Sequence, residues 1–200
     1  ATLTAAPPAG GDWVIENKFD GYRAVIKIAG GAVRILTRNG NDWTSKLTSL
    51  ATEIESLGID KAWLDGEMVV LNEHSVPDFN RLQNAFDNAR TKDIVLYLFD
   101  VPFLGDMDLR RVPLRSRRMV LQELLKTNAS ERIRFSEELP ATPSAVLSAA
   151  CQLGLEGVML KAADAPYVSS RSDTWLKLKC QRRQEFVVVG FTDRTNAPKE

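Results

Sequence analysis

Strand-forming and helix-forming segments follow each other irregularly along this chain, and that order limits the folds open to it. Apolar and alternating patterns predict strands at 13–15, 22–28, 33–37, 63–71, 94–101, 157–161, 174–179 and 185–191. Helical periodicity predicts helices at 47–57, 79–86, 113–126 and 145–153. Neighbouring parallel strands need a long crossover, usually a helix, and this order does not supply one regularly. We therefore predict an α+β fold with mostly antiparallel sheet.

Individual residues predict several element boundaries. The Gly-Gly pair at 30–31 predicts the turn of a hairpin between the second and third strands. Thr44 or Ser45 is expected to cap the first helix, Asp78 is expected to cap the second, and Pro102 is expected to end the strand before it. The inward residues of the helix at 113–126 are predicted to include Leu114, Met119, Leu121, Leu124 and Leu125.

Composition excludes several classes of protein. The 200 residues are 44% apolar, which is enough for a core, and 26 basic residues balance 26 acidic ones. This balance argues against a highly basic nucleic-acid coat, although a local basic groove remains open. With a single histidine, His74, a zinc site or a histidine-dependent mechanism is disfavoured. Cys151 and Cys180 have no metal-ligand spacing and are predicted to be buried free thiols.

The same features predict where the protein acts. Free thiols suit a reducing compartment. No signal peptide opens the sequence, and no apolar run is long enough to span a membrane. We therefore expect a cytoplasmic protein without a membrane partner.

One lysine stands out from the other basic residues. Lys18 lies between Glu16 and Asp20, and Gly21 and Arg23 follow directly before a strand. A lysine is a nucleophile only after it loses its proton, and burial or neighbouring cations promote that loss. The acids can position it, the glycine lets backbone approach a ligand, and the arginine can clamp a phosphate. This segment predicts covalent chemistry at Lys18.

Four later segments place polar residues inside strong strand patterns. An Asp-Gly-Glu run at 65–67 is expected to interrupt one strand, and Phe99 with an aspartate ends the next. Glu156 begins a strand that Lys161 ends. A final Leu-Lys-Leu-Lys run at 176–179 puts two lysines on the same face of its strand. Two adjacent ammonium groups favour an anion between them, and nearby acids could hold a divalent metal that bridges its phosphates.

Each segment taken alone also has a structural explanation. Lys177 and Lys179 could lie on a solvated strand face, and Glu67 could be a surface acid. Phe99 and Met159 could belong to the core, and the Arg-Asn-Gly run from Arg38 could be a hairpin tip. Lys18 is the exception, because its neighbours do not resemble a solvated surface.

Taken in order, these segments resemble the motifs of the covalent nucleotidyltransferases. Lys-x-Asp-Gly-x-Arg, Asp-Gly-Glu, Phe-Asp, Glu-Gly-Val-Met-x-Lys and Leu-Lys-x-Lys occur in register. That superfamily contains DNA ligases, RNA ligases and mRNA-capping guanylyltransferases. The segments 37–44, 97–101, 156–161 and 171–179 are most similar to the ligase domain of bacterial DNA ligase D. The resemblance covers approximately residues 1–190.

The resemblance implies a fold and a division into domains. The fold would be the covalent-nucleotidyltransferase (ATP-grasp-like) fold: two mainly antiparallel sheets, flanking helices and a nucleotide cleft between the sheets. Residues 1–184 would form the adenylation domain, and residues 185–200 would begin a truncated OB-fold domain. We expect the chain to bind ATP and self-adenylate slowly, and to seal nicks weakly or not at all.

The resemblance also implies a role for each matching residue. Lys18 would attack the α-phosphate of ATP and hold AMP, while Arg23, Lys177 and Lys179 would assist the transfer. Glu67 and Glu156 would hold a divalent metal, Mg or Mn. Arg23 would contact the ribose or phosphates, and Arg38 would help bind the nucleotide or the 5′-phosphate of the nick. Glu16 would recognise the adenine edge, and Phe99 and Met159 would cover its two faces. The other residues implied in nucleotide binding are Asn17, Lys18, Glu67, Lys161, Lys177 and Lys179.

The implied reaction is DNA ligation in double-strand break repair by non-homologous end joining. AMP would pass from Lys18 to the 5′-phosphate of nicked or broken duplex DNA in the bacterial nucleoid. The implied partners are an OB-fold domain in cis, polymerase and phosphoesterase modules, and an end-binding protein. The alternatives are an RNA ligase, a GTP-using capping enzyme, an NAD-using ligase, a non-catalytic nucleotide- or DNA-binding module, and a domain whose motifs arose by chance.

Overall fold

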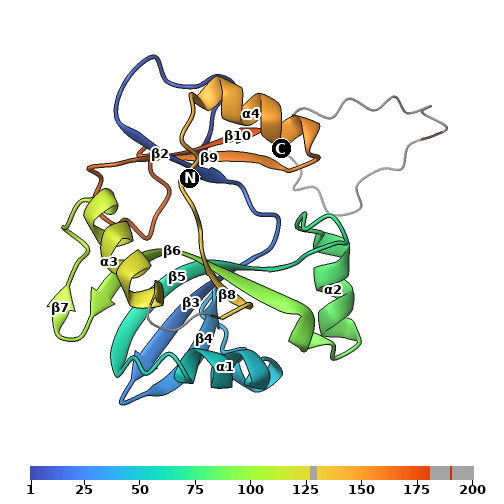
Figure 1. Cartoon of the computed structure of the whole chain (residues 1–200), viewed down its shortest axis with the longest axis vertical. Coiled ribbons are helices and arrows are strands. Elements are labelled where there is room, and N and C mark those ends of the chain that lie inside the picture. The colour runs from blue at the N-terminus through green and yellow to red at the C-terminus, as the bar shows by residue number, and fades with distance from the viewer. Residues whose placement is uncertain (127–129, 181–189, 191–200) are drawn as a thin grey trace, which may run out of the picture.

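The computed structural model of this chain has two sheets stacked across a gap, with helices on their outer sides (Figure 1). The structure describes residues 1–126, 130–180 and 190. Apart from Gly190, the strand expected at 185–191 and the OB-fold domain lie outside the described residues. Both sheets are mainly antiparallel, as the sequence predicted.

The larger sheet has six strands and carries the first half of the chain. A hairpin of β3 (Tyr22–Ala29) and β4 (Ala32–Thr37) forms one edge. The hairpin turns at Gly30 and Gly31, which both have positive φ, so this prediction is confirmed. The remaining strands are β5 (Lys61–Val70), β6 (Ile94–Leu104), β7 (Met107–Asp108) and β8 (Ile133–Phe135), and β8 pairs with β6 in parallel.

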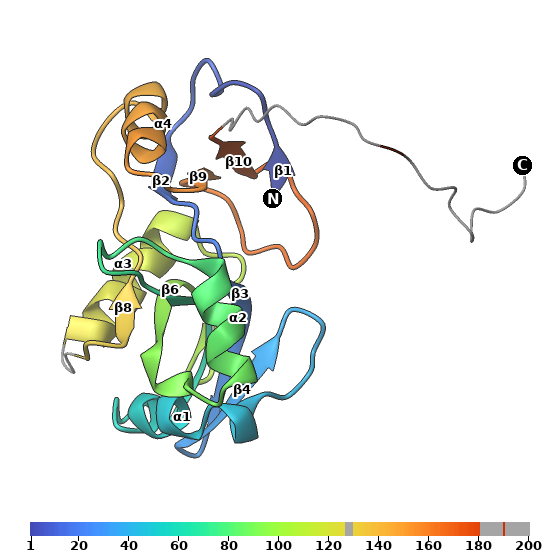
Figure 2. The same ribbon diagram turned by 90° about the vertical axis from the view of Figure 1, so that its right-hand side faces the viewer.

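The smaller sheet combines the start of the chain with its later part. Its order is β1 (Thr2–Leu3), β10 (Trp175–Lys179), β9 (Gly157–Ala162) and β2 (Trp13–Asn17). Figure 2 shows this sheet as a separate layer above the larger one. The chain therefore crosses between the layers directly after β2, which is where Lys18 lies.

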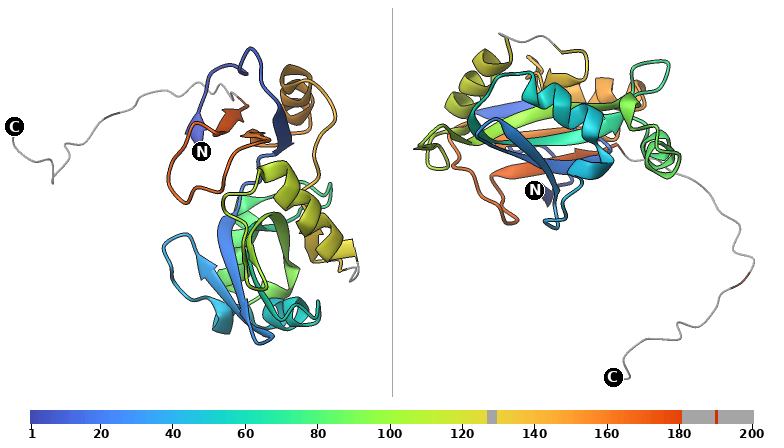
Figure 3. Two further views of the ribbon diagram at one scale, coloured as in Figure 1. Left: turned by 90° about the vertical axis from the view of Figure 1, so that its left-hand side faces the viewer. Right: turned by 90° about the horizontal axis from the view of Figure 1, so that it is seen from below.

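Helices cover the outer faces of both sheets, and the helix at 114–126 also flanks the gap, where the N–H of Leu114 donates to the carbonyl of Ala165 at 3.0 Å. Three helices pack into one core with the larger sheet: α1 (Thr48–Glu55), α2 (Phe79–Asp87) and α3 (Leu114–Lys126). Figure 3, seen from below, shows α1 in front of that sheet. The fourth helix, α4 (Pro143–Gln152), packs on the smaller sheet in a separate core. Two short 3-10 helices, η1 (Thr44–Lys46) and η2 (Thr91–Asp93), complete the described elements.

The two predicted helix caps have different outcomes. The side chain of Asp78 accepts a hydrogen bond from the backbone N–H of Arg81, which confirms the cap of α2. The prediction for the first helix is wrong, because α1 begins after Leu47 without a side-chain cap. The Thr44 hydroxyl instead accepts a hydrogen bond from the N–H of Ile35 at 2.9 Å. Thr44 therefore fastens η1 to the neighbouring strand β4.

The polar run at 65–67 does not interrupt its strand, contrary to the prediction. β5 continues through it, and Pro102 likewise lies inside β6 rather than at its end. Both exceptions occur where the pairing of β5 with β6 shifts register. Asp65 faces Asp100 and Gly66 faces Leu98, so Phe99 is an extra residue in β6. Such bulges absorb residues that a regular ladder excludes and redirect side chains.

Two predictions about individual side chains are also wrong. Cys151 and Cys180 form a disulfide that joins the end of α4 to the residue after β10, so neither is a free thiol. Met119 is 63% exposed, because the inward face of α3 is formed by residues at helical spacing from Leu114. The buried residues of α3 are Leu114, Arg117, Arg118 and Leu121. No helix in the described part of the chain is long and apolar enough to cross a membrane.

Candidate active site

A cavity of about 460 Å³ lies between the two sheets, within the usual size range of small-molecule sites. Its walls come from segments far apart in the sequence, including the ends of β2 and β4, the centre of β5 and the bulge of β6. All the predicted site residues except Glu156 and Lys179 line it. These lining residues are Glu16, Asn17, Lys18, Arg23, Arg38, Glu67, Phe99, Met159, Lys161 and Lys177.

Lys18 and Lys179 share one carboxylate at the edge of the cavity. The ammonium of Lys18 pairs with Glu156 Oε2, and Lys179 Nζ lies 2.8 Å from Glu156 Oε1. Burial raises the pKa of Glu156, but hydrogen bonds from Lys179 and Lys18 outweigh this effect and hold the pKa below its ordinary value. The sequence predicted a polyphosphate between Lys177 and Lys179, and that stays a prediction; Glu156 is a protein anion that bridges a different pair, Lys18 and Lys179.

Two glycines let backbones approach closely around Lys18. A Cβ at Gly157 would overlap the carbonyl oxygen of Leu178, and a Cβ at Gly21 would overlap that of Met68. The carbonyl of Gly157 accepts the backbone N–H of Lys18 at 3.0 Å. Gly21 was expected to bring backbone close to a ligand, but it brings the segment after Lys18 close to β5 instead. Both glycines therefore fix where Lys18 leaves the smaller sheet.

Arg23 is held by a buried acid. Its Nε and Nη2 donate to the two carboxylate oxygens of Asp65 at 2.9 and 2.5 Å, and Asp65 is fully buried. The hydroxyl of Tyr167 donates to the same carboxylate at 2.8 Å. Burial lowers the pKa of Arg23, but its bond to Asp65 outweighs this and raises the pKa above the ordinary value. Arg23 therefore presents a permanent, oriented positive charge to the cavity.

Glu67 lies beside these cations, but they do not fully compensate for its burial. Burial raises its pKa to about 7, although Arg23 and Lys18 oppose the increase. No group of three or more Asp, Glu, His or Cys side chains that could hold a metal occurs among the described residues. Mg²⁺ in nucleotide sites commonly uses one or two carboxylates and takes its other ligands from phosphates and water. Glu67 and Glu156 fit that donor set.

Aromatic side chains form another wall of the cavity, and the Arg23 guanidinium lies 5.8 Å from the ring centroid of Phe99 and 5.6 Å from that of Trp175. The rings of Phe99 and Trp175 meet edge to face, with centroids 5.8 Å apart. Lys161 Nζ lies 3.9 Å from the first centroid and 4.2 Å from the second. Burial lowers the pKa of Lys161. The bulge in β6 is what directs Phe99 into this wall while its neighbours Leu98 and Val101 pack in the core.

Glu16 is buried behind this aromatic wall and is fully bonded. Its Oε1 accepts from Arg118 Nη1 at 2.6 Å and from Lys161 Nζ at 3.0 Å. Its Oε2 accepts from the Ser136 hydroxyl at 2.7 Å and from Lys161 at 2.9 Å. A carboxylate has about four acceptor positions, so a ligand that bonds Glu16 must displace one of these donors.

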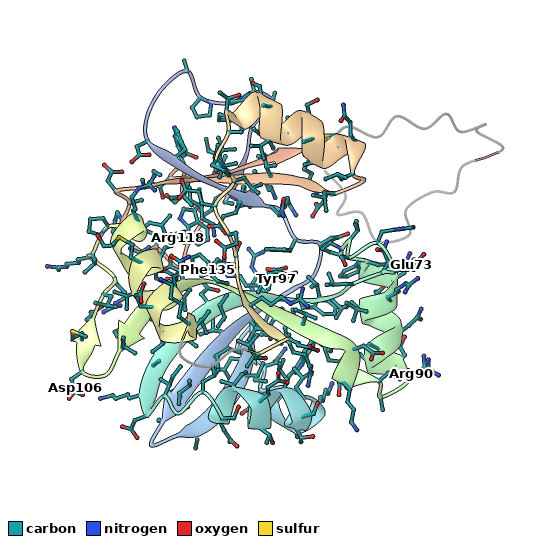
Figure 4. The ribbon with its side chains drawn as sticks, in the orientation of Figure 1. Glu73, Arg90, Tyr97, Asp106, Arg118 and Phe135 are labelled. Carbon is teal, nitrogen blue, oxygen red and sulfur yellow. A yellow bond between two sulfur atoms is a disulfide. The ribbon has the colours of Figure 1, made fainter. Side chains whose placement is uncertain are left out.

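Several residues of this site were not identified from the sequence. In the sequence, Asp65 could not be distinguished from a turn residue, Tyr167 from an aromatic residue in a loop, or Trp175 from an aromatic residue of the core. Arg118 did leave a signal that was not used, because it occupies a core position on the amphipathic face of α3. A charged residue is rarely buried unless it is paired. Figure 4 shows Arg118 beside Phe135, between the two sheets.

Comparison with known proteins places the chain in a family. The family model described as "ATP dependent DNA ligase domain" matches residues 5–179. A relative from Pseudomonas aeruginosa, "Multifunctional non-homologous end joining protein LigD", is 49% identical over 96% of this chain and 23% of its own length. A relative from Mycobacterium tuberculosis with a similar name is 32% identical over 94% of this chain and 24% of its own length. The chain therefore spans about a quarter of these relatives.

Solved structures have the same fold. The ligase domain of M. tuberculosis LigD has a TM-score of 0.76 and is 32% identical, and the match covers 89% of this chain and 59% of that one. A mycobacterial DNA ligase D complexed with ATP and MES has a TM-score of 0.71 and 30% identity over 90% of this chain and 60% of its own. With the family model matching most of the sequence, this chain belongs to the ATP-dependent DNA ligase domain family.

Proposed function

We propose that this chain is the adenylation domain of an ATP-dependent DNA ligase. Lys18 Nζ attacks the α-phosphorus of ATP, an N–P bond forms, and the bond to the pyrophosphate oxygen breaks. The observation that supports this best is the position of the Lys18 amine, which is mostly buried at a cavity whose walls carry Arg23, Arg38 and Lys177. Preorganised cations of this kind stabilise charge on a transferring phosphoryl group.

The attack requires that Lys18 first lose a proton. Glu156 Oε2 contacts the Lys18 ammonium and orients it, so the proton would leave to water or to a phosphate oxygen of the bound nucleotide. Lys179 holds the other oxygen of this carboxylate, so the carboxylate stays oriented. The triphosphate binds along Arg23 and Lys177, with pyrophosphate leaving in line and opposite the lysine nitrogen. We propose that Phe99 and Met159 hold adenine, with Glu16 at its edge and Lys161 at its aromatic wall.

A divalent metal, Mg or Mn, fits this site through Glu67 and Glu156. When bound, it neutralises negative charge on the phosphates and on the leaving pyrophosphate. Burial raises the pKa of Glu67 to about 7 in the metal-free chain, and a bound cation would favour its ionised form.

The second half of the reaction concerns DNA and rests on the relatives. Because proteins with this domain are named for non-homologous end joining, we propose that AMP passes to the 5′-phosphate of nicked or broken duplex DNA. Arg38 follows β4 at the rim of the cavity, where it can meet that phosphate. Sealing would require partners outside these residues: an OB-fold domain, polymerase and phosphoesterase modules and an end-binding protein. The proposed location is the bacterial nucleoid in the cytoplasm.

The adduct itself provides the test. The wild-type chain, incubated with ATP labelled at the α-phosphate, is expected to retain label after denaturation, and Lys18→Ala is expected to retain none. Lys27→Ala is the matched control, because it removes a lysine of β3 that does not line the cavity. Label on Lys18→Ala at the level of Lys27→Ala would refute the proposal.

The same assay separates the enzymatic alternatives. Label from GTP rather than ATP would indicate a capping enzyme, and label from NAD would indicate an NAD-using ligase. The full-length protein offered nicked DNA and nicked RNA distinguishes a DNA ligase from an RNA ligase. A chain that binds ATP without any adduct would be a non-catalytic module.

A further inference from the structure

We propose that Arg118 is a positioning residue for base selectivity, and this inference rests on the proposed function. Arg118 does not line the cavity, yet it bonds two residues that do, Glu16 and Phe99. These residues come from different sheets: Glu16 is in β2 and Phe99 is in β6. Arg118 thereby sets where the carboxylate lies relative to the aromatic ring.

The guanidinium makes these contacts as a rigid fork. Nη1 donates to Glu16 Oε1 at 2.6 Å and reaches the carbonyl of Phe99 at 3.4 Å, while Nη2 donates to the carbonyl of Ser136 at 2.7 Å. The ring of Phe135 lies under the guanidinium, 4.6 Å from its centre (Figure 4). Arg118 itself is only 4% exposed. A planar fork of donors fixes direction in a way that a lysine ammonium does not.

This arrangement determines what Glu16 can recognise. With Arg118, Lys161 and the Ser136 hydroxyl all donating to it, Glu16 presents only acceptor oxygens. Such a group favours a purine with an amino group at position 6 and repels one with a carbonyl oxygen there. Of the three donors to Glu16, Lys161 is the one that lines the cavity, so the base amine would take the place of one of the two Lys161 bonds while Arg118 and Ser136 hold the carboxylate from behind.

Without the guanidinium, the Glu16 carboxylate loses its fixed orientation and its fixed position relative to the Phe99 ring. Glu16 would keep only Lys161 and the Ser136 hydroxyl as partners and could turn, and the Phe99 carbonyl would lose its link to α3. A loosened cavity alone would lower kcat/KM for all nucleotides equally. Loss of Glu16 orientation would instead weaken the preference for the 6-amino purine over its 6-oxo analogue.

The test measures adduct formation with ATP and with inosine triphosphate on the same protein sample. The ratio of the two kcat/KM values does not depend on the folded fraction, because both nucleotides report on the same molecules. Arg118→Met is expected to lower the ATP preference about tenfold or more, the usual scale for a hydrogen bond to a charged group. Arg118→Lys, which keeps the charge without the fork, is expected to fall between Arg118→Met and wild type.

The neighbouring Arg117 supplies the matched control. It is fully buried on the same helix and forms a two-pronged pair with Asp100 at 2.7 and 2.8 Å, but it does not contact Glu16. Arg117→Lys is therefore expected to lower the melting temperature and leave the ATP preference within about twofold of wild type. If Arg118→Met does not fold, Phe135→Leu replaces it, because that change removes the support under the guanidinium and is expected to lower the ratio more moderately.

Three outcomes distinguish the claims. A fall in the ratio for the Arg118 or Phe135 variants with none for Arg117→Lys supports the inference. Equal ratios in all variants, alongside a normal wild-type adduct with ATP, overturn it and leave the proposed function intact. Absence of any wild-type adduct with ATP refutes the proposed function itself.

Discussion

At the scale of single residues, the carboxylates around the cavity differ in how completely cations pair with them. Asp65 and Glu16 are buried and bonded by cations, while Glu67 is close to cations but receives less compensation for its burial. A buried acid without full pairing favours its protonated form. Glu67 is therefore the acid whose charge state depends on conditions near neutral pH.

This difference predicts a pH-dependent stability. The pKa of Glu67 is raised from 4.5 to about 7 in the folded chain, so the folded state binds more protons than the unfolded state between these values. Stability from this group is therefore present below about pH 4.5 and is lost as the pH rises to about 7. Since a tenfold change in proton affinity is worth about 1.4 kcal/mol, the loss is about 3 kcal/mol.

Glu67→Gln removes this titration. The variant is expected to be more stable than wild type at pH 8, and the difference is expected to disappear toward pH 5. Urea unfolding of both proteins at several pH values measures it. A difference that stays constant from pH 5 to 8 would show that Glu67 does not titrate in this range.

At the scale of elements, glycine at the start of β9 holds the site together. Gly157 pairs with Lys179 of β10, accepts the N–H of Lys18, and adjoins Glu156. Its φ of 151° lies in a region that favours glycine, and a Cβ there would overlap the carbonyl of Leu178. The position of the Glu156 carboxylate between Lys18 and Lys179 thus depends on glycine at position 157.

Gly157→Ala is expected to destabilise the chain by about 2 kcal/mol or more, because β9 and β10 must separate. It is also expected to slow adduct formation even at temperatures where the variant is folded, since Glu156 and Lys179 move apart. Gly10→Ala is the control: a Cβ there meets no atom within 4 Å, and no change is expected. Thermal unfolding with adduct assays checks both. Normal adduct formation by folded Gly157→Ala would contradict this account of the site.

Most elements and most of the site were predictable from the sequence, and the exceptions have physical causes. Periodicity located the longer strands but missed β1, β7 and β8, which have only two or three residues each, and the order of motifs singled out Lys18, Glu67 and Glu156. The polar run at 65–67 was expected to break β5 because each of its residues disfavours strands in isolation. In the fold, Asp65 is compensated by Arg23 and Tyr167 from outside the strand, which a local pattern does not contain.

At the scale of the whole molecule, a disulfide encloses the segment that supplies the site residues of β9 and β10. Cys151 and Cys180 are 29 residues apart, and the loop between them contains both β9 and β10. Sequence alone did not predict the pair, because it depends on α4 packing beside the end of β10. The bond also removes the free thiols as an argument for a reducing compartment.

Reduction of this bond is expected to lower the stability. Cross-links that close loops of this size contribute about 2–4 kcal/mol, largely by restricting the unfolded chain. The melting temperature is expected to fall by roughly 5–10 °C with reductant. The double variant Cys151→Ser, Cys180→Ser is expected to melt at the temperature of the reduced wild type, and reductant is expected to leave its melting temperature unchanged. Equal melting of wild type with and without reductant would mean that the bond adds nothing to stability.

The account depends most on a covalent bond between Lys18 and AMP. Intact mass spectrometry of the chain, before and after incubation with ATP and a divalent metal, measures this bond directly. We predict a mass gain of one AMP that pyrophosphate reverses and that Lys18→Ala does not show. An unchanged mass under conditions where ATP binds, or the same gain on Lys18→Ala, would contradict it.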